Sequence, residues 1–158
     1  MPIPAYMYIN NGDIKGGCTV SGREGSVEVL EFKHEVRIPT DPDTGQLTGT
    51  RKHESLYIVK AFDQSSPLIY KAVCEGLTWD EVRIDWFRID DEGAETVYFK
   101  HTLQKVKVCS IRPFMYNVKA KEYERYVHME EVQLRYAKII WEYPDGGFMH
   151  SDSWLEGR

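Results

Sequence analysis

Polar and apolar side chains alternate along several stretches of the chain, which is the pattern of half-buried β-strands. The longest stretch is residues 27–38, where from Leu30 onward the even positions are apolar or histidine and the odd positions are all charged. One face of this predicted strand packs into a core and the other faces water, as in an antiparallel sheet. We also predict strands at residues 5–9, 56–62, 82–89, 95–100 and 103–111, the last of them ended by Pro113.

One short helix is predicted at residues 67–75. Ser66 suits the N-cap, Pro67 suits the first helical position, and Gly76 suits the left-handed residue that ends a helix. A helix this short is not stable alone, so its apolar stripe must dock on the sheets. The stripe consists of Leu68, Ile69, Ala72 and Val73.

A long polar segment, residues 40–53, separates two predicted strands. Pro39 ends the first strand, and Pro42, Gly45 and Gly49 give the segment turn chemistry. It is too long for a tight hairpin and too polar for a core. Irregular connections of this length in a compact domain are usually functional or ordered by a partner, so we expect a functional loop here.

Two regions near the C-terminus are less clearly patterned. Residues 123–143 fit a helix or a strand about equally well, because Tyr126, Met129, Val132 and Tyr136 have helical spacing while Val132, Leu134 and Tyr136 also alternate with polar residues. For residues 123–131 the choice between helix and strand stays open. The segment after Pro144 is polar and rich in glycine, and we expect residues 144–158 to be mobile or docked on a neighbour.

Composition fits an ordinary globular protein. At 158 residues we expect a single domain spanning residues 1–158, and the net charge of -5 disfavours general binding to nucleic acids or to anionic membranes. The sequence shows neither a signal-peptide pattern nor an apolar stretch long enough to insert into a membrane, so we expect folding in the cytoplasm. Cys18, Cys74 and Cys109 are widely spaced and are expected to be reduced thiols.

The chain contains no recognisable catalytic or metal-binding motif. Its five histidines have no ligand spacing, and His34, on the apolar face of its strand, is expected to be a hydrogen-bonded structural residue. Asp41 and Asp43 flank a proline and are interpreted as turn residues that cap their own backbone. We therefore predict no enzyme activity, no metal and no cofactor. The ten tyrosines and four tryptophans leave open a carbohydrate-binding β-sandwich or a small-molecule-binding β-barrel.

The loop and the helix start carry a family resemblance. The segment H-x-V-x-x-P-T-D-x-x-T-G-x-x-x-G-x-R-x-H, followed by K-x-x-D-x-S-S-P-L, resembles the Hcp family (haemolysin-coregulated protein) of type VI secretion systems. Met1-Pro2 and the late K-I-I-W segment are also similar to that family. The matching residues are His34, Val36, Pro39, Thr40, Asp41, Thr44, Gly45, Gly49, Arg51, His53, Lys60, Asp63, Ser65, Ser66, Pro67, Leu68, Lys138, Ile139, Ile140 and Trp141.

This resemblance implies a tail-tube protein with a β-barrel or two-sheet sandwich fold, one flanking helix and a long loop. It implies homohexameric rings that stack into a tube, with type VI effectors in the lumen and the spike and sheath proteins of the apparatus as partners. It also favours a long strand over residues 130–143. Such a subunit would assemble in the cytoplasm and be secreted with its effectors without a cleaved signal peptide.

Two sets of residues are candidate sites for assembly and cargo. The charged face of the predicted strand must meet water, outside or in a channel, because burying opposite charges is costly; local matching to the family places a cargo contact at Lys33. This candidate lumen face consists of Glu31, Lys33, Glu35 and Arg37. The candidate inter-subunit loop consists of Thr40, Asp41, Pro42, Asp43, Thr44, Gly45, Gln46, Leu47, Thr48, Gly49, Thr50, Arg51 and His53.

Overall fold

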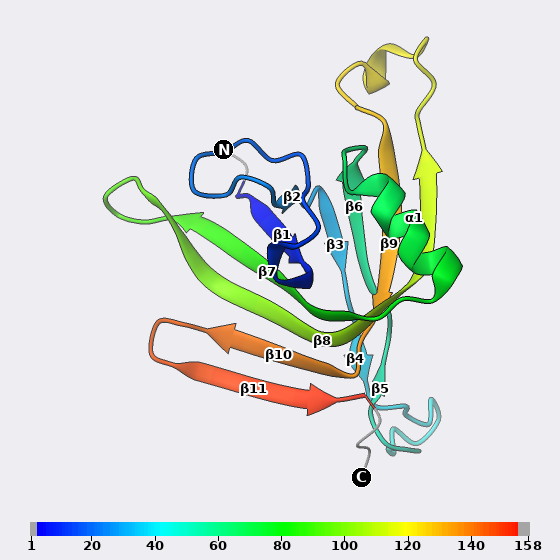
Figure 1. The fold of residues 1–158 in the computed structure, drawn as a ribbon. Coiled ribbons are helices and arrows are strands. Elements are labelled where there is room, and N and C mark those ends of the chain that lie inside the picture. Colours follow the sequence, from blue (N-terminus) through cyan, green and yellow to red (C-terminus); the bar gives the residue numbers. More distant parts are fainter. Residues whose placement is uncertain (1–2, 155–158) are drawn as a thin grey trace.

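A computed structural model describes residues 3–154, which form a mostly β structure with one α-helix (Figure 1). This confirms the predicted fold class. The elements are β1 (Ala5–Ile9), β2 (Val27–Glu28), β3 (Glu31–Lys33), β4 (Val36–Arg37), β5 (Lys52–His53), β6 (Leu56–Ala61), α1 (Ser66–Glu75), β7 (Trp79–Ile89), β8 (Glu95–Phe114), β9 (Met129–Arg135), β10 (Lys138–Tyr143) and β11 (Phe148–Ser153), with short 3-10 turns at Asn10–Gly12 and Lys121–Tyr123.

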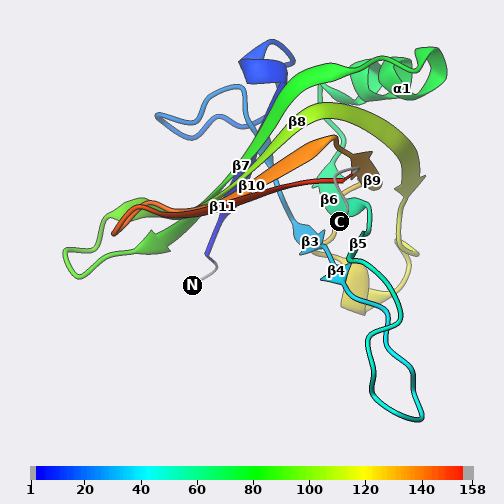
Figure 2. The same ribbon diagram turned by 90° about the horizontal axis from the view of Figure 1, so that it is seen from below.

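The long strand β8 joins two antiparallel sheets. Its first half pairs with β7 on one side and β10 on the other, and β1, β2 and β11 complete that sheet. Its second half pairs with β9, which continues through β6 to β3. Lys105, where the pairing changes sheets, has a φ of 53°. A bend of this kind lets one strand serve two sheets, and β8 curves strongly in Figure 2.

The core lies between the two sheets and the helix. α1 begins after Ser65, one residue earlier than predicted, and ends at Gly76 with φ 65° as expected. Of the predicted stripe, Ile69 and Ala72 are buried, whereas Leu68 is exposed at the rim. The fully buried aliphatic side chains include Met7, Ile9, Leu56, Ile58, Ile69, Ile84, Leu103, Leu134 and Ile139.

A buried charge cluster fixes the start of α1 to the second sheet. The Lys60 ammonium lies 2.5 Å from Glu130 Oε1 and 3.1 Å from Asp63 Oδ1. The Ser66 hydroxyl donates to the same Glu130 oxygen at 2.7 Å, and the Gly17 amide donates to Asp63 at 3.0 Å. Lys60 and Glu130 are fully buried. Because β6, β9 and α1 each supply one group, this cluster locks their relative positions.

The strand predicted at residues 27–38 is wrong as one element. The segment stays extended but changes partner twice, so it forms β2 against β1, β3 against β6 and β4 against β5. The first change of partner falls between two adjacent residues, since the Val29 amide donates to the Ala5 carbonyl while the Leu30 amide donates to the Val59 carbonyl. The prediction that the apolar face packs into a core is also wrong in part, because Leu30, Val36 and Ile38 are exposed. Alternation carries no information about which strand the backbone pairs with.

Several further elements differ from the predictions. The two strands predicted at 95–100 and 103–111 are the single strand β8, which continues through Pro113 to Phe114. Residues 123–131 are mainly irregular, and β9 begins at Met129. The strand favoured at residues 130–143 is divided into β9 and β10 by a corner at Tyr136 and Ala137. The predicted tail forms β11 on β10, and residues 155–158 lie outside the described range.

Candidate assembly loop and charged face

The segment between β4 and β5 projects away from both sheets (Figure 2). Its conformation is nevertheless defined, because the Asp41 carboxylate accepts the Asp43 amide at 2.8 Å and the Thr44 amide at 3.3 Å. This confirms Asp41 as a turn residue. Gly45 has φ 75°, a value that favours glycine, and a backbone bridge joins Thr40 to Leu47. The loop tip is therefore a small, pre-formed hairpin.

Most of the candidate loop residues lie on this projecting part, and two do not. Residues 42–50 are all exposed, with Leu47 66% exposed. Arg51 and His53 instead turn back onto β11. Both Asp152 oxygens accept hydrogen bonds from the Arg51 guanidinium, at 2.5 and 2.7 Å. Arg51 and His53 therefore hold the base of the loop and are not displayed at its tip.

We call the group formed by His34, Arg51, His53, Tyr136 and Asp152 the loop latch. The two histidines flank the tyrosine hydroxyl, with His53 Nδ1 at 2.7 Å and His34 Nε2 at 2.8 Å. The hydrogen bond of His34 confirms its predicted structural role. The latch joins the segments before and after the loop to the β9–β10 corner and to β11.

The geometry of the latch allows a continuous chain of hydrogen bonds from Asp152 to His34. Asp152 is an ionised acceptor, so His53 Nε2, which lies 2.7 Å from it, carries the donating proton. With that proton on Nε2, His53 Nδ1 can accept the hydroxyl proton of Tyr136, and the Tyr136 oxygen can accept from His34 Nε2–H. Each ring nitrogen that faces a partner thus has a defined role.

The charges around the latch keep this arrangement in place. Hydrogen bonds from Arg51, followed by those from His53, hold the pKa of Asp152 down at about 2. Burial, and then the charge of Asp152, raises the pKa of Tyr136 well above its usual value. Burial lowers the pKa of His34, and the neighbouring His53 adds to that effect. At neutral pH the latch therefore has an ionised aspartate and a neutral tyrosine.

The candidate lumen face is exposed along its whole length. Lys33 pairs with Glu31 at 3.0 Å, while Arg37 lies 3.7 Å from Glu35 and 3.1 Å from Glu54. The four residues predicted to meet water do so. Their ion pairs run along the surface in solvent, where each contributes little to stability.

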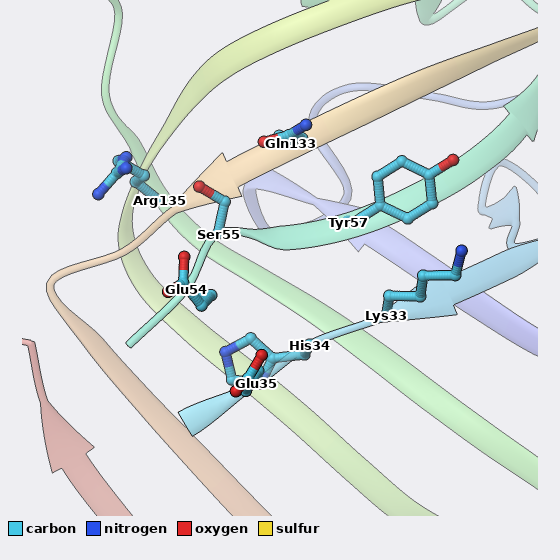
Figure 3. A pocket seen from close by; sticks show the side chains of 8 residues that line it. All are labelled: Lys33, His34, Glu35, Glu54, Ser55, Tyr57, Gln133 and Arg135. Atoms are coloured by element: carbon cyan, nitrogen blue, oxygen red, sulfur yellow. The ribbon is translucent and has the colours of Figure 1, made fainter. Parts of the chain in front are cut away.

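Part of this face borders an open hollow of about 480 Å³ (Figure 3). Lys33 and Arg135 bring positive charge to its wall and Glu35 and Glu54 bring negative charge, from three different segments of the chain. The remaining lining residues are His34, Ser55, Tyr57 and Gln133. A shallow wall of mixed charge can make weak, salt-sensitive contacts and lacks the enclosure of a small-molecule site.

The surroundings of the other titratable groups give no indication of catalysis. Within residues 3–154 no three histidine, cysteine or carboxylate groups gather as metal ligands. The three cysteines are free thiols. No helix in the described part of the chain is long and apolar enough to span a membrane. The features of the described residues are therefore a pre-formed projecting loop, its latch and an open charged face.

Comparison with known proteins identifies the class as the tail-tube proteins of type VI secretion systems. A family model described as "Type VI secretion system effector, Hcp" matches residues 6–143. The "Major exported protein" of Pseudomonas aeruginosa is 34% identical over 166 residues, covering 98% of this chain and 96% of the relative. The chain belongs to the Hcp family and is a secreted, structural tube subunit of the type VI apparatus.

Solved structures agree with this assignment. Hcp1 from E. coli EAEC 042 is 42% identical, with a TM-score of 0.84 over 98% of this chain and 99% of that one. Hcp3 from Pseudomonas aeruginosa is 28% identical, with a TM-score of 0.79 over 98% of this chain and 100% of that one. These likenesses do not favour the sugar-binding sandwich or the ligand-binding barrel.

Sequence reasoning found the loop and missed what holds it. Asp152 lay in a segment expected to be mobile, and Tyr136 was weighed only as a strand or helix residue. The available signal was the charged and aromatic composition of the tail, which pairs with Arg51 and His53 only once the chain has folded. Contacts across about 100 positions of sequence leave no local pattern.

Proposed function

We propose that six copies of this chain close into a ring, that rings stack into a tube, and that the projecting loop contacts an adjacent subunit or ring. Hcp membership supports tube assembly and ring oligomers. The observation that carries the proposal is the loop hairpin, which is exposed along residues 42–50 yet fixed by its own backbone bonds and by the latch. Pre-organisation of this kind reduces the entropic cost of forming a contact.

The charged face of Glu31, Lys33, Glu35 and Arg37 is proposed to line the tube, where type VI effectors would touch it. Its mixed charges favour transient binding, which suits cargo that must later leave. We further propose that the subunit assembles in the cytoplasm, meets the spike and sheath proteins of the apparatus, and leaves without a cleaved signal peptide. It has no proposed catalytic residue, cofactor or metal.

The test is the mass of the native particle and its dependence on the loop. Light scattering and negative-stain microscopy should show rings of six, and a monomer that persists at high protein concentration would contradict the proposal. Deleting residues 42–49 should leave the thermal transition nearly intact and weaken ring closure or stacking, because every residue of this segment is exposed. If the deletion unfolds the subunit, and assembly is lost only in proportion, the loop serves internal packing.

A further inference from the structure

The loop tip presents a single large aliphatic side chain, Leu47, among threonines, aspartates and glycines. Leu47 is 66% exposed, and the backbone on both sides of it is fixed. The Asp41 amide donates to the Gln46 carbonyl at 2.7 Å, and the Thr48 amide donates to the Pro39 carbonyl at 2.9 Å. The fold thus holds an exposed apolar side chain in a defined position, as is typical of the anchor residues of protein interfaces.

An apolar recess lies at the far end of the molecule. It is an open hollow of about 320 Å³ where the end of β8, the start of β9 and the residue after β6 meet. Met115 and Phe62 in its wall are 55% and 48% exposed. Its lining residues are Phe62, Pro113, Phe114, Met115 and His128. A recess with an aromatic and aliphatic wall fits an inserted aliphatic side chain.

An aromatic cluster supports the recess on its outer side. In the connection between β8 and β9, the Tyr116 and Tyr123 rings stack with centroids 4.5 Å apart, and Tyr126 packs edge-on against both. Phe114 in turn contacts Tyr116 edge-on. The connection therefore has packing of its own, and its apolar surface is a formed feature of the subunit.

The loop and the recess lie at opposite ends of the subunit along one direction. In Figure 1 the loop hangs below β4 and β5, while the β8–β9 connection forms the upper tip. In Figure 2, seen along the vertical direction of Figure 1, the base of the loop lies near the β8–β9 connection in projection, and the rest of the loop extends away from it. The loop of one copy therefore cannot fill its own recess, and a loop can meet a recess only between two copies that are displaced along that direction and turned relative to each other.

Charge is complementary across this contact. The loop between Pro39 and Arg51 carries two acidic residues, Asp41 and Asp43, and no basic one. The β8–β9 connection beside the recess exposes the cations Lys119, Lys121 and Arg125 against the anions Glu122 and Glu124. An acidic loop with an apolar tip thus faces an apolar recess with a more basic rim, an arrangement that favours this pairing over loop against loop.

We propose that Leu47 of one copy docks in the recess formed by Phe62, Pro113, Phe114, Met115 and His128 of a copy in the next ring. This inference rests on the proposed stacking of rings and names the surface that receives the loop. The contact is heterologous, so each ring offers its loops on one side and its recesses on the other. Stacking therefore has a polarity that the subunit itself sets.

Disulfide trapping tests the pairing. In a background with Cys18, Cys74 and Cys109 each replaced by serine, Leu47→Cys is combined with Met115→Cys, and purified rings are oxidised with oxidised glutathione. Covalent multimers should appear as a ladder on denaturing gels without reductant and disappear with it. The matched controls are each cysteine alone and Leu47→Cys with Val20→Cys, since Val20 is exposed outside the recess. The controls should give no ladder beyond dimers.

The outcomes separate this inference from the proposed function. If rings form and stack by microscopy but the cysteine pair gives no more ladder than the controls, the docking site is wrong while stacking stands. If no rings form before cysteines are introduced, both fail. As a second variant, Met115→Asp should abolish stacking and leave single rings intact. Stacking that survives Met115→Asp, together with loss of effector co-purification, would assign the recess to a different partner and overturn the inference.

Discussion

Two charge clusters, one buried and one exposed, consist of the same residue types but contribute differently to the stability of the fold. In the buried cluster, Lys60 and Glu130 are 2.5 Å apart beneath α1, and both are fully inaccessible. On the exposed face, Lys33 and Glu31 are 3.0 Å apart in open solvent. The separations are similar, so distance alone does not distinguish the pairs. The environment does, because water screens and solvates the second pair and is excluded from the first.

This difference shows which charged residues fix the fold and which can be replaced without destabilising it. Removing one partner of a buried pair leaves an uncompensated charge, so the buried cluster ties β6, β9 and α1 to one arrangement. Charges on the exposed face can be exchanged at little cost to folding, so that face can vary while the fold is kept. The loop latch lies between these extremes, since His53 is buried while Arg51 and Asp152 are partly exposed.

The largest effect is expected from breaking the buried pair. Lys60→Met leaves the Glu130 carboxylate buried, with the Ser66 hydroxyl as its remaining donor and Oε2 still without a partner within the described residues. We expect a loss of about 3–5 kcal/mol in the free energy of unfolding and a melting temperature lower by roughly 10 °C. Urea unfolding at fixed protein concentration measures it.

Two controls sharpen that result. Lys33→Met removes the same charge from the exposed face and should change stability by less than about 0.5 kcal/mol. The double variant Lys60→Met, Glu130→Leu should recover most of the loss, because it removes the stranded carboxylate as well. Equal losses in Lys60→Met and Lys33→Met would show that burial does not separate the two clusters.

A second prediction concerns a buried group that stays uncharged. The Trp86 indole N–H donates to His101 Nδ1 at 2.8 Å, so that nitrogen must be unprotonated. Burial, with a smaller contribution from His34, lowers the pKa of His101 from 6.5 to about 4. Between pH 6.5 and 4 this histidine is therefore protonated in the unfolded chain and neutral in the folded chain. The free energy of unfolding should fall by about 2–3 kcal/mol as the pH drops across that range.

His101→Gln keeps an acceptor for Trp86 and removes the titration. Its stability should therefore be flatter than that of the wild type over the same pH range, while His150→Gln, which alters an exposed histidine, should follow the wild type. Chemical denaturation at half-unit pH intervals gives both curves. Parallel curves for wild type and His101→Gln would assign the acid sensitivity to other groups, including His34.

These contrasts also show what the sequence could and could not predict. Alternation correctly identified the exposed set Glu31, Lys33, Glu35 and Arg37, because side-chain period is a local property. The opposite face was predicted to be buried, yet Leu30, Val36 and Ile38 are exposed, because burial depends on what packs over a strand. It failed to show that residues 27–38 change partner twice, since pairing depends on distant strands. The turn chemistry of Asp41 was local and was predicted, whereas Asp152 meets Arg51 only through the pairing of β10 with β11.

A third, smaller effect is expected at the latch. Asp152→Asn removes the charge that accepts from Arg51 and His53, and at pH 7 it should cost about 1–2 kcal/mol, allowing for partial exposure. Because the folded pKa of Asp152, about 2, is below its ordinary value of 3.8, this stabilisation is present above pH 3.8 and disappears as the pH falls toward 2.

The measurement for the latch is the stability difference between wild type and Asp152→Asn at pH 7, 4 and 2.5. That difference should shrink across the last two values, and amide hydrogen exchange around residues 51–54 should be faster in the variant at pH 7. Asp145→Asn, at an exposed turn, is the control and should change neither. A difference that persists unchanged at pH 2.5 would show that the charge of Asp152 is not what stabilises the latch.

The smallest effect on folding is expected from Lys33→Glu on the exposed face. The ammonium of Lys33 is mostly in solvent beside Glu31, so reversal should change the free energy of unfolding by about 0.5 kcal/mol or less. Rings should form as before, but a lumen wall made more acidic should change effector co-purification and its dependence on salt. If assembly, co-purification and secretion all match the wild type, the charged face is a solvated outer surface and the lumen lies elsewhere.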